Sequence, residues 1–402
     1  MFYLGHYFIQ MKKSLLILGV VLTVTGFAQP IKLTNKATIS VITFGPGQEE
    51  LYSAFGHSGI RVRDSLLQFD AFFNYGVFNF NQPHFYLNFA RGYLYYMVEA
   101  YPYADFREYY IAHNRFVHEQ VINLNPQQTQ AIFDFLWVNV QPQNQTYRYD
   151  YFYNNCATKV RDAFKAVLKD DVVFDSSFIK TDYTIRNLTD LYLPQQPWGD
   201  LGIDICLGLP MDKKALPFEY MFLPDYIESS FDHATNKALG AALVKEKIIT
   251  FESAPQKISF HWVHPWIVFG VFLSFVSLLT WRDWQSKKLS RWFDVVLFST
   301  LGLLGILLLL LWTLTDHKAA ANNFNLLWAL PTHVVAAIFL LRKQKPKWLG
   351  TYFLVTTILS ALVLGLWYFL PQSLNVFLMP IVGAILLRAL VNFQLIQQNR
   401  KA

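Results

Sequence analysis

Cys156 has the residue type and the setting of a nucleophile. It follows Asn155, and asparagine is a favoured N-cap, so the segment predicts an amphipathic helix with Cys156 in its first turn. The apolar residues that recur at helical spacing behind it are Val160, Ala163, Phe164 and Val167. Unpaired N–H groups and the positive end of the helix dipole stabilise a thiolate, which lowers a cysteine pKa from its usual value of about 8.5.

His57 is the expected partner of this thiol. The segment 56–63 predicts a strand with His57 at its start, because two apolar residues, Ile60 and Val62, alternate with arginines. A histidine on a strand beside the cysteine helix would shuttle the thiol proton. The plainer interpretation is a buried cysteine that acts as a small hydrophobe, together with a structural histidine.

A second cysteine, Cys206, raises the possibility of a disulfide with Cys156, since exported proteins form such bonds. The surroundings of Cys206, residues 202–208, look like a buried strand or loop with no activating partner. We therefore expect Cys156 alone to be the nucleophile and keep the disulfide as the alternative.

Two residues are candidates to orient the His57 imidazole, Asp70 and Asn74. Further strands are expected at 66–73 and around 75–80, and Asp70 lies thirteen residues after His57, a separation compatible with a hairpin. Asp70 and Asn74 share strand parity and so share a face. The pattern does not choose between them, and Asp70 is equally well explained as an ordinary strand carboxylate.

The C-terminal part of the chain predicts a membrane domain. Five stretches are long and apolar enough to cross a bilayer, for which about 20 residues are needed: 262–281, 293–313, 324–341, 349–370 and 374–393. The loops 282–291 and 342–347 carry four Lys or Arg each, whereas the alternate connections hold only Lys318. By the positive-inside rule, the basic loops and the C-terminus are cytoplasmic.

The N-terminus predicts export of everything before this domain. Met11-Lys12-Lys13, an apolar run at 15–27 and Ala28 have the form of a signal peptide, and we expect Met11 to be the true start. The expected organisation is a signal peptide at 1–28, a periplasmic domain at 29–257, a five-helix membrane domain at 258–396 and a cytoplasmic tail at 397–402. A helix at 125–140 is also expected, with Asn125 as its cap.

Composition agrees with this division. The chain is 53% hydrophobic and only 15% charged, where soluble proteins carry roughly a quarter charged residues. Its net charge of +6 comes largely from the cytoplasmic loops, which removes the case for nucleic acid binding. The spacing of a metal site and the motifs of nucleotide cofactors are both absent from the exported sequence, so neither a metal nor a cofactor is expected.

Motifs around the two catalytic candidates resemble known enzymes. The segments Phe55-Gly56-His57-Ser58-Gly59-Ile60-Arg61-Val62 and Asn155-Cys156-Ala157-Thr158, with histidine first, resemble the circularly permuted branch of papain-like enzymes, which includes NlpC-type relatives. The whole chain resembles the Lnb-type lipoprotein N-acyltransferases of Gram-negative bacteria, in domain order as well as motifs. The further matching pieces are Asn74-Tyr75-Gly76, Tyr147-Arg148-Tyr149-Asp150, Leu201-Gly202-Ile203-Asp204, Leu207-Gly208 and Met221-Phe222-Leu223-Pro224.

This resemblance implies an α+β fold and an activity. The fold is a permuted papain-like cysteine-enzyme domain followed by an all-α transmembrane bundle of five helices. The activity is an acyl transfer at the inner membrane, in which Cys156 takes a chain from a phospholipid as a thioester and passes it to the α-amine of a diacylglyceryl-cysteine lipoprotein. The resemblance also implies a substrate contact for Tyr75. The alternatives are an NlpC-type cell-wall cysteine peptidase and a non-catalytic, membrane-anchored binding module.

Two further regions have a possible role in lipid handling. Between residues 69 and 116, 18 of 48 residues are Phe or Tyr, which suits either a membrane interface or a packed aromatic core. The segment 316–333, on the outer side of the membrane, is unusually polar. Its residues His317, Asn323, Asn325 and His333 are expected either to bind a lipid head group or the acceptor, or to form interhelical hydrogen bonds beside a proline kink.

Overall fold

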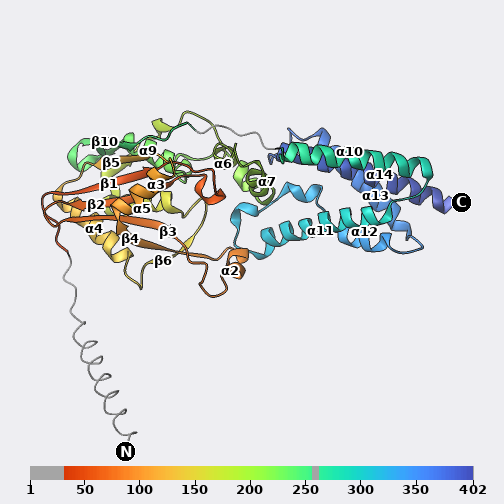
Figure 1. The fold of residues 1–402 in the computed structure, drawn as a ribbon, viewed down its shortest axis with the longest axis horizontal. Coiled ribbons are helices and arrows are strands. Elements are labelled where there is room, and N and C mark those ends of the chain that lie inside the picture. Colours follow the sequence, from red (N-terminus) through yellow and green to blue (C-terminus); the bar gives the residue numbers. More distant parts are fainter. Residues whose placement is uncertain (1–30, 256–261, 402) are drawn as a thin grey trace, which may run out of the picture.

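The computed structural model describes residues 31–255 and 262–401. They form a lobe built around a β-sheet and, beside it, a group of long helices (Figure 1). The expected signal peptide at 1–28, with the proposed start at Met11, lies outside the described residues.

A seven-stranded antiparallel sheet forms the centre of the lobe, in the order β10-β5-β1-β2-β3-β4-β6. Its strands are β1 Ala37–Phe44, β2 His57–Asp64, β3 Phe69–Val77, β4 Leu94–Pro102, β5 Val117–Ile122, β6 Thr146–Tyr149 and β10 Val244–Phe251. A small second sheet holds β7 Val172–Phe174, β8 Ala234–Asn236 and β9 Ala241–Ala242. The expectation of separate strands at 66–73 and 75–80 is wrong, because a turn at 65–68 delays the first and both belong to β3.

Helices cover both faces of this sheet. The helices of the lobe are α2 Phe85–Arg91, α3 Tyr103–Ala112, α4 Pro126–Asn139, α5 Cys156–Leu168, α6 Ile185–Asp190, α7 Pro197–Cys206, α8 Pro217–Tyr220 and α9 Pro224–Asp232. Helices α4, α5 and α9 share a core with Val41 and Ile60, whereas α3 packs on Ile42 and Phe72 from the other face. The expected cap of α4 is confirmed, since Asn125 forms a capping box with Gln128.

Four described helices are long and apolar enough to cross a membrane. The helices of this domain are α10 Pro265–Ser286, α11 Arg291–Leu314, α12 His333–Leu340, α13 Lys347–Gly365 and α14 Met379–Lys401. The third expected span, 324–341, is instead a 3₁₀ turn at Phe324–Leu327 followed by the eight-residue α12. Pro331 lies between them, and proline both lacks an N–H donor and disfavours helix in the residue before it. Five spanning helices are therefore not confirmed among the described residues, where four helices meet the length and composition of a span.

A buried ion-pair network joins three of the membrane helices. Arg388 of α14 contacts Asp294 of α11 at 2.7 Å and Asp283 of α10 at 2.9 Å. Arg388 and Asp294 are completely buried, and Asp283 almost so. Arg388 thus serves as a structural counter-ion inside the bundle.

Replacing Arg388 with methionine is expected to destabilise the membrane domain by about 3–5 kcal/mol, because two buried carboxylates lose their counter-ion. The measurement is unfolding of the purified protein by denaturing detergent. Arg342→Met is the control, since this loop arginine is exposed and its side chain makes a cation–π contact with Phe339 but no ion pair with the described residues. Equal stability of both variants would show that the network contributes nothing.

Candidate active site

Local capping places Cys156 at the start of α5, as expected. The Asn155 side chain accepts a hydrogen bond from the Thr158 N–H at 2.9 Å, and the Thr158 hydroxyl accepts one from the Asn155 N–H at 2.8 Å. The Asn155 amide also donates to the Phe222 carbonyl at 2.7 Å. This capping box holds the thiol in the first turn, where the N–H groups of the helix have no intrahelical partner.

The structure brings His57 to this thiol. His57 is the first residue of β2, and its ring hydrogen-bonds the Cys156 side chain. Burial opposes the thiolate, but the charge and hydrogen bond of His57 and the backbone N–H groups of Ser58 and Ala157 lower the Cys156 pKa below its usual value. Burial likewise opposes the imidazolium, yet Cys156 and Asn74 raise the His57 pKa. The two shifts together favour a thiolate–imidazolium pair.

Asn74, and not Asp70, contacts the imidazole. Asn74 Oδ1 lies 2.6 Å from His57 Nε2, which leaves Nδ1 of the ring for the thiol. Asp70 instead forms a bidentate pair with Arg61, with distances of 2.6 and 2.7 Å. Arg61 in turn reaches Glu119 at 2.9 Å. The Asp70 carboxylate is therefore committed to a strand ion pair, which is the plainer of its two interpretations.

Strand β3 passes directly beside the thiol. Gly76 adopts φ +98°, and a Cβ at this position would lie 3.6 Å from the Cys156 Cβ. The strand register shifts between Tyr75 and Val77, so Gly76 forms a bulge at the point of closest approach. The left-handed backbone favours glycine here, whereas a Cβ at this position would make only an ordinary van der Waals contact with Cys156.

Buried tyrosines of β3 and β6 line this region. Tyr75, expected to contact substrate, is almost fully buried and lies edge-on to Tyr147, with the ring centroids 6.1 Å apart. Burial and the charge of Cys156 raise the Tyr147 pKa, so its hydroxyl stays protonated. That hydroxyl is buried beside the Gly76 backbone N–H, and it is a donor near the thiol that sequence reasoning did not single out.

The polar residues expected at the outer membrane surface join the two parts of the chain. Asn323 and Asn325 donate to the Ile205 carbonyl near the end of α7, at 2.8 and 3.2 Å. His317 Nε2 lies 3.0 Å from the Phe89 carbonyl of α2. The Ile205 carbonyl lies in the last turn of α7, where carbonyls lack intrahelical partners, so the two asparagines satisfy it. The structure does not bring the three residues to Cys156.

His333 and Cys206 also lie in surroundings that suit a structural role. His333 is buried between the Trp328 carbonyl and the Tyr352 hydroxyl, at 3.1 and 2.8 Å. Cys206 is the last residue of α7, so the expectation of a strand or loop around it is wrong. Both cysteines are free, which excludes the Cys156–Cys206 disulfide from this structure. Burial raises the Cys206 pKa, so its thiol is not activated.

Sequence reasoning missed an acidic cluster on α6 and α7. Asp190, Asp200 and Asp204 each bring a carboxylate oxygen within 4.8 Å of the others. Arg186 pairs with Asp204 at 2.6 Å. Burial and the neighbouring carboxylates raise the Asp190 pKa to about 8, so it holds a proton at neutral pH. The cluster is thus balanced by an arginine and a proton, and its members come from two helices with no spacing that would have revealed them.

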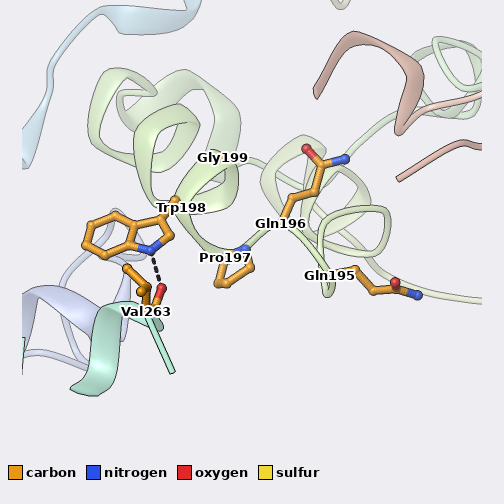
Figure 2. A pocket seen from close by; sticks show the side chains of 6 residues that line it. All are labelled: Gln195, Gln196, Pro197, Trp198, Gly199 and Val263. Atoms are coloured by element: carbon orange, nitrogen blue, oxygen red, sulfur yellow. Dashed lines mark hydrogen bonds between the residues drawn. The ribbon is translucent and has the colours of Figure 1, made fainter. Parts of the chain in front are cut away.

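An open pocket of about 380 Å³ lies where the lobe meets the start of α10. It is lined by Gln195, Gln196, Pro197, Trp198, Gly199 and Val263 (Figure 2). The Trp198 indole N–H donates to the Val263 carbonyl across it at 2.6 Å. None of its lining residues belongs to the His57–Asn74–Cys156 group, so this pocket is separate from the candidate active site.

Two family models match the chain. Residues 30–190 match the Lnb N-terminal periplasmic domain, and residues 256–400 match the Lnb transmembrane domain. The chain belongs to the Lnb family. No curated protein and no solved structure matches it significantly. As in the Lnb family, a periplasmic domain precedes a membrane domain, and all three residues of the candidate site lie within the matched periplasmic part.

Proposed function

We propose that this Lnb-family protein is a lipoprotein N-acyltransferase. It moves an acyl chain from a phospholipid, through a thioester on Cys156, to the α-amine of a diacylglyceryl-cysteine lipoprotein. The observation that carries the proposal is the hydrogen-bonded series Cys156–His57–Asn74 in a domain joined to membrane helices. We further propose that the lobe is a permuted papain-like domain, since the histidine strand precedes the cysteine helix, and that the helices lie in the inner membrane with the C-terminus cytoplasmic.

The first half-reaction forms the thioester. The Cys156 thiol gives its proton to His57, and the sulfur attacks the carbonyl carbon of a phospholipid ester. When the ester C–O bond breaks, the imidazolium returns the proton to the departing lysophospholipid oxygen. The Asn74 side chain keeps the ring oriented with Nδ1 toward the sulfur.

The second half-reaction releases the chain as an amide. The lipoprotein α-amine attacks the thioester carbonyl, His57 removes a proton from the amine, and the C–S bond breaks to regenerate the thiol. A thioester is reactive enough for attack by an amine, and the amide formed is more stable than either ester. The N–H groups of Ser58 and Ala157, which face the sulfur, and the buried Tyr147 hydroxyl are the donors that we propose for the oxyanion.

The two alternatives are less well supported. A cell-wall peptidase of the NlpC type would use the same pair but has no need of four apolar helices. A non-catalytic binding module would not need the Cys156 pKa lowered by a histidine that an asparagine holds in place. An acyltransferase uses both features.

The test is expression in a strain that lacks its own lipoprotein N-acyltransferase, with mass spectrometry of a lipoprotein N-terminus. The expected result is a third acyl chain on the terminal cysteine. A lipoprotein that keeps two chains, together with peptide release when the protein is mixed with purified cell wall, would favour the peptidase instead.

Replacing Asn74 with alanine is expected to lower kcat by about tenfold to a hundredfold, because a misplaced imidazole removes the proton inefficiently. KM for the lipid should change little, and Asn74→Gln should restore part of the rate. The measurement is thioester formation under single-turnover conditions.

The matched control for this variant is Asp70→Asn, on the same strand. Its loss of an Arg61 ion pair at a partly exposed position should cost little stability and leave the rate nearly unchanged. If Asp70→Asn is the slow variant and Asn74→Ala is not, the assignment of the orienting residue is wrong.

A further inference from the structure

We propose that residues 78–91, here called the α2 segment, insert their apolar side chains into the periplasmic leaflet of the lipid bilayer. The chain has no Asp, Glu, Lys or Arg from residue 71 to residue 90. Within this stretch the large apolar side chains that are exposed are Phe80, Tyr86, Leu87 and Phe89, at 42–78% of their full accessibility. The kind of partner that such a surface fits is lipid.

Helix α2 exposes an unusually large share of its side chains to the surface. It is one short helix of seven residues, and Phe85 is its only buried residue. Tyr86 is 78% exposed and Leu87 is 55% exposed. Soluble surfaces rarely expose neighbouring large apolar residues together, and contiguous patches of this kind mark protein or membrane contacts.

Hydrogen bonds fix this helix at the outer end of a spanning helix. The Asp316 N–H, two residues beyond α11, donates to the Arg91 carbonyl at 3.0 Å. The backbone at Gly92 packs so closely on Asp316 that a Cβ would meet its carbonyl carbon at 3.0 Å, and Gly92 has φ +79°. In Figure 1, α2 lies at the boundary between the lobe and the helices, beside the end of α11.

The membrane level follows from α11. Its 24 residues extend about 36 Å, enough to cross the hydrocarbon core of about 30 Å. The end of α11 at Leu314 therefore lies at the periplasmic surface of the bilayer, and the last residue of the α2 segment, Arg91, is hydrogen-bonded to Asp316 at that level. The apolar surface is thus continuous with the lipid-facing surface of α11, and this continuity identifies bilayer lipid as its occupant.

The charged end of the segment suits the same partner. Arg91 closes α2, its guanidinium lies over the Tyr93 ring at 5.1 Å, and it forms no ion pair within the part of the chain that the structure describes. An arginine at this level reaches lipid phosphates, while tyrosines prefer the interface. The combination of apolar residues, a tyrosine and a terminal arginine is typical of an interfacial helix.

The α2 segment is also close to the candidate active site along the chain. It begins two residues after Gly76, where an added Cβ would lie 3.6 Å from the Cys156 Cβ. Insertion would hold the end of β3, and with it the thiol, at the lipid surface. This consequence for donor access rests on the proposed function, whereas insertion itself does not.

The test measures insertion independently of activity. Full-length protein carrying Cys156→Ala and Cys206→Ala receives one environment-sensitive fluorophore, at Leu87→Cys or, as a second position, Tyr86→Cys. The control is Leu66→Cys, which is similarly exposed but lies in the turn at the far end of the same β2–β3 hairpin. Each is reconstituted in nanodiscs of phosphatidylethanolamine and phosphatidylglycerol, with and without spin-labelled lipid.

Spin-labelled lipid is expected to quench the probes at residues 86 and 87 at least about twofold and to leave the probe at residue 66 nearly unchanged. Equal quenching at all three positions, or none at 86 and 87, would overturn the inference. A second arm uses Leu87→Asp in the chain with both cysteines. It should slow thioester formation from bilayer phospholipid about tenfold and leave the rate with detergent-dispersed phospholipid unchanged. Quenching without any thioester in either arm would reject the proposed function and keep the insertion.

Discussion

Replacing Cys156 with serine is expected to abolish addition of the third acyl chain, with a loss of at least about a thousandfold in rate. A serine hydroxyl at this position has a much higher pKa than the thiol, so His57 and the backbone N–H groups of Ser58 and Ala157 no longer hold an ionised nucleophile. The measurement is mass spectrometry of a lipoprotein N-terminus after expression in a strain without its own N-acyltransferase.

The matched control is Cys206→Ala, which removes the other cysteine of the chain. Cys206 ends α7 and burial raises its pKa, so this variant should add the third chain at nearly the normal rate. If Cys206→Ala loses activity and Cys156→Ser keeps it, the nucleophile is Cys206 and the assignment to Cys156 is wrong.

The second large effect is expected for His57→Ala, with transfer slowed about a thousandfold. The cause is visible in the ionisation of the thiol itself. Burial raises the Cys156 pKa, and the charge and hydrogen bond of His57 are the main effects that lower it. Removing the imidazole leaves burial, which raises the pKa, so the thiolate is formed only at higher pH. The rate of Cys156 alkylation against pH should therefore move to the alkaline side.

The control for this variant is His113→Ala, because His113 is exposed and its ring contacts the carbonyl and the ring of Tyr109 but neither His57 nor Cys156. That variant should keep the alkylation profile of the parent. Asn74→Ala should shift the profile in the same direction as His57→Ala but less far, since its hydrogen bond raises the His57 pKa. An unchanged profile in His57→Ala would mean that the histidine does not ionise the thiol.

The elements that carry the two main residues could be predicted because their signals are local. An asparagine cap before a helical apolar pattern predicts the start of α5, and alternation of Ile60 and Val62 with arginines predicts β2. The orienting residue could not be chosen in the same way. Asp70 and Asn74 share one face of β3, and only the actual pairing shows that Arg61 occupies the carboxylate.

The prediction of the membrane domain agrees with the structure in outline and differs from it in one element. Hydropathy identifies apolar stretches, but it does not register the cost of Pro331 inside the stretch 324–341, which ends as the short α12. The roles of Asn323 and Asn325 depend on carbonyls of α7 more than a hundred residues away. Such long-range partners leave no periodic trace in the sequence, which is why these side chains looked available for a ligand.

The central claim is that Cys156 carries the acyl chain, and direct detection of that thioester tests it best. Purified full-length protein is incubated with a phospholipid of defined chain length and no acceptor, and the Cys156 peptide is examined by mass spectrometry. The account predicts an added acyl group on this peptide, removed by neutral hydroxylamine and discharged by a diacylated lipopeptide with a free α-amine. Appearance of the N-acylated lipopeptide with no acyl group ever found on Cys156 would contradict it.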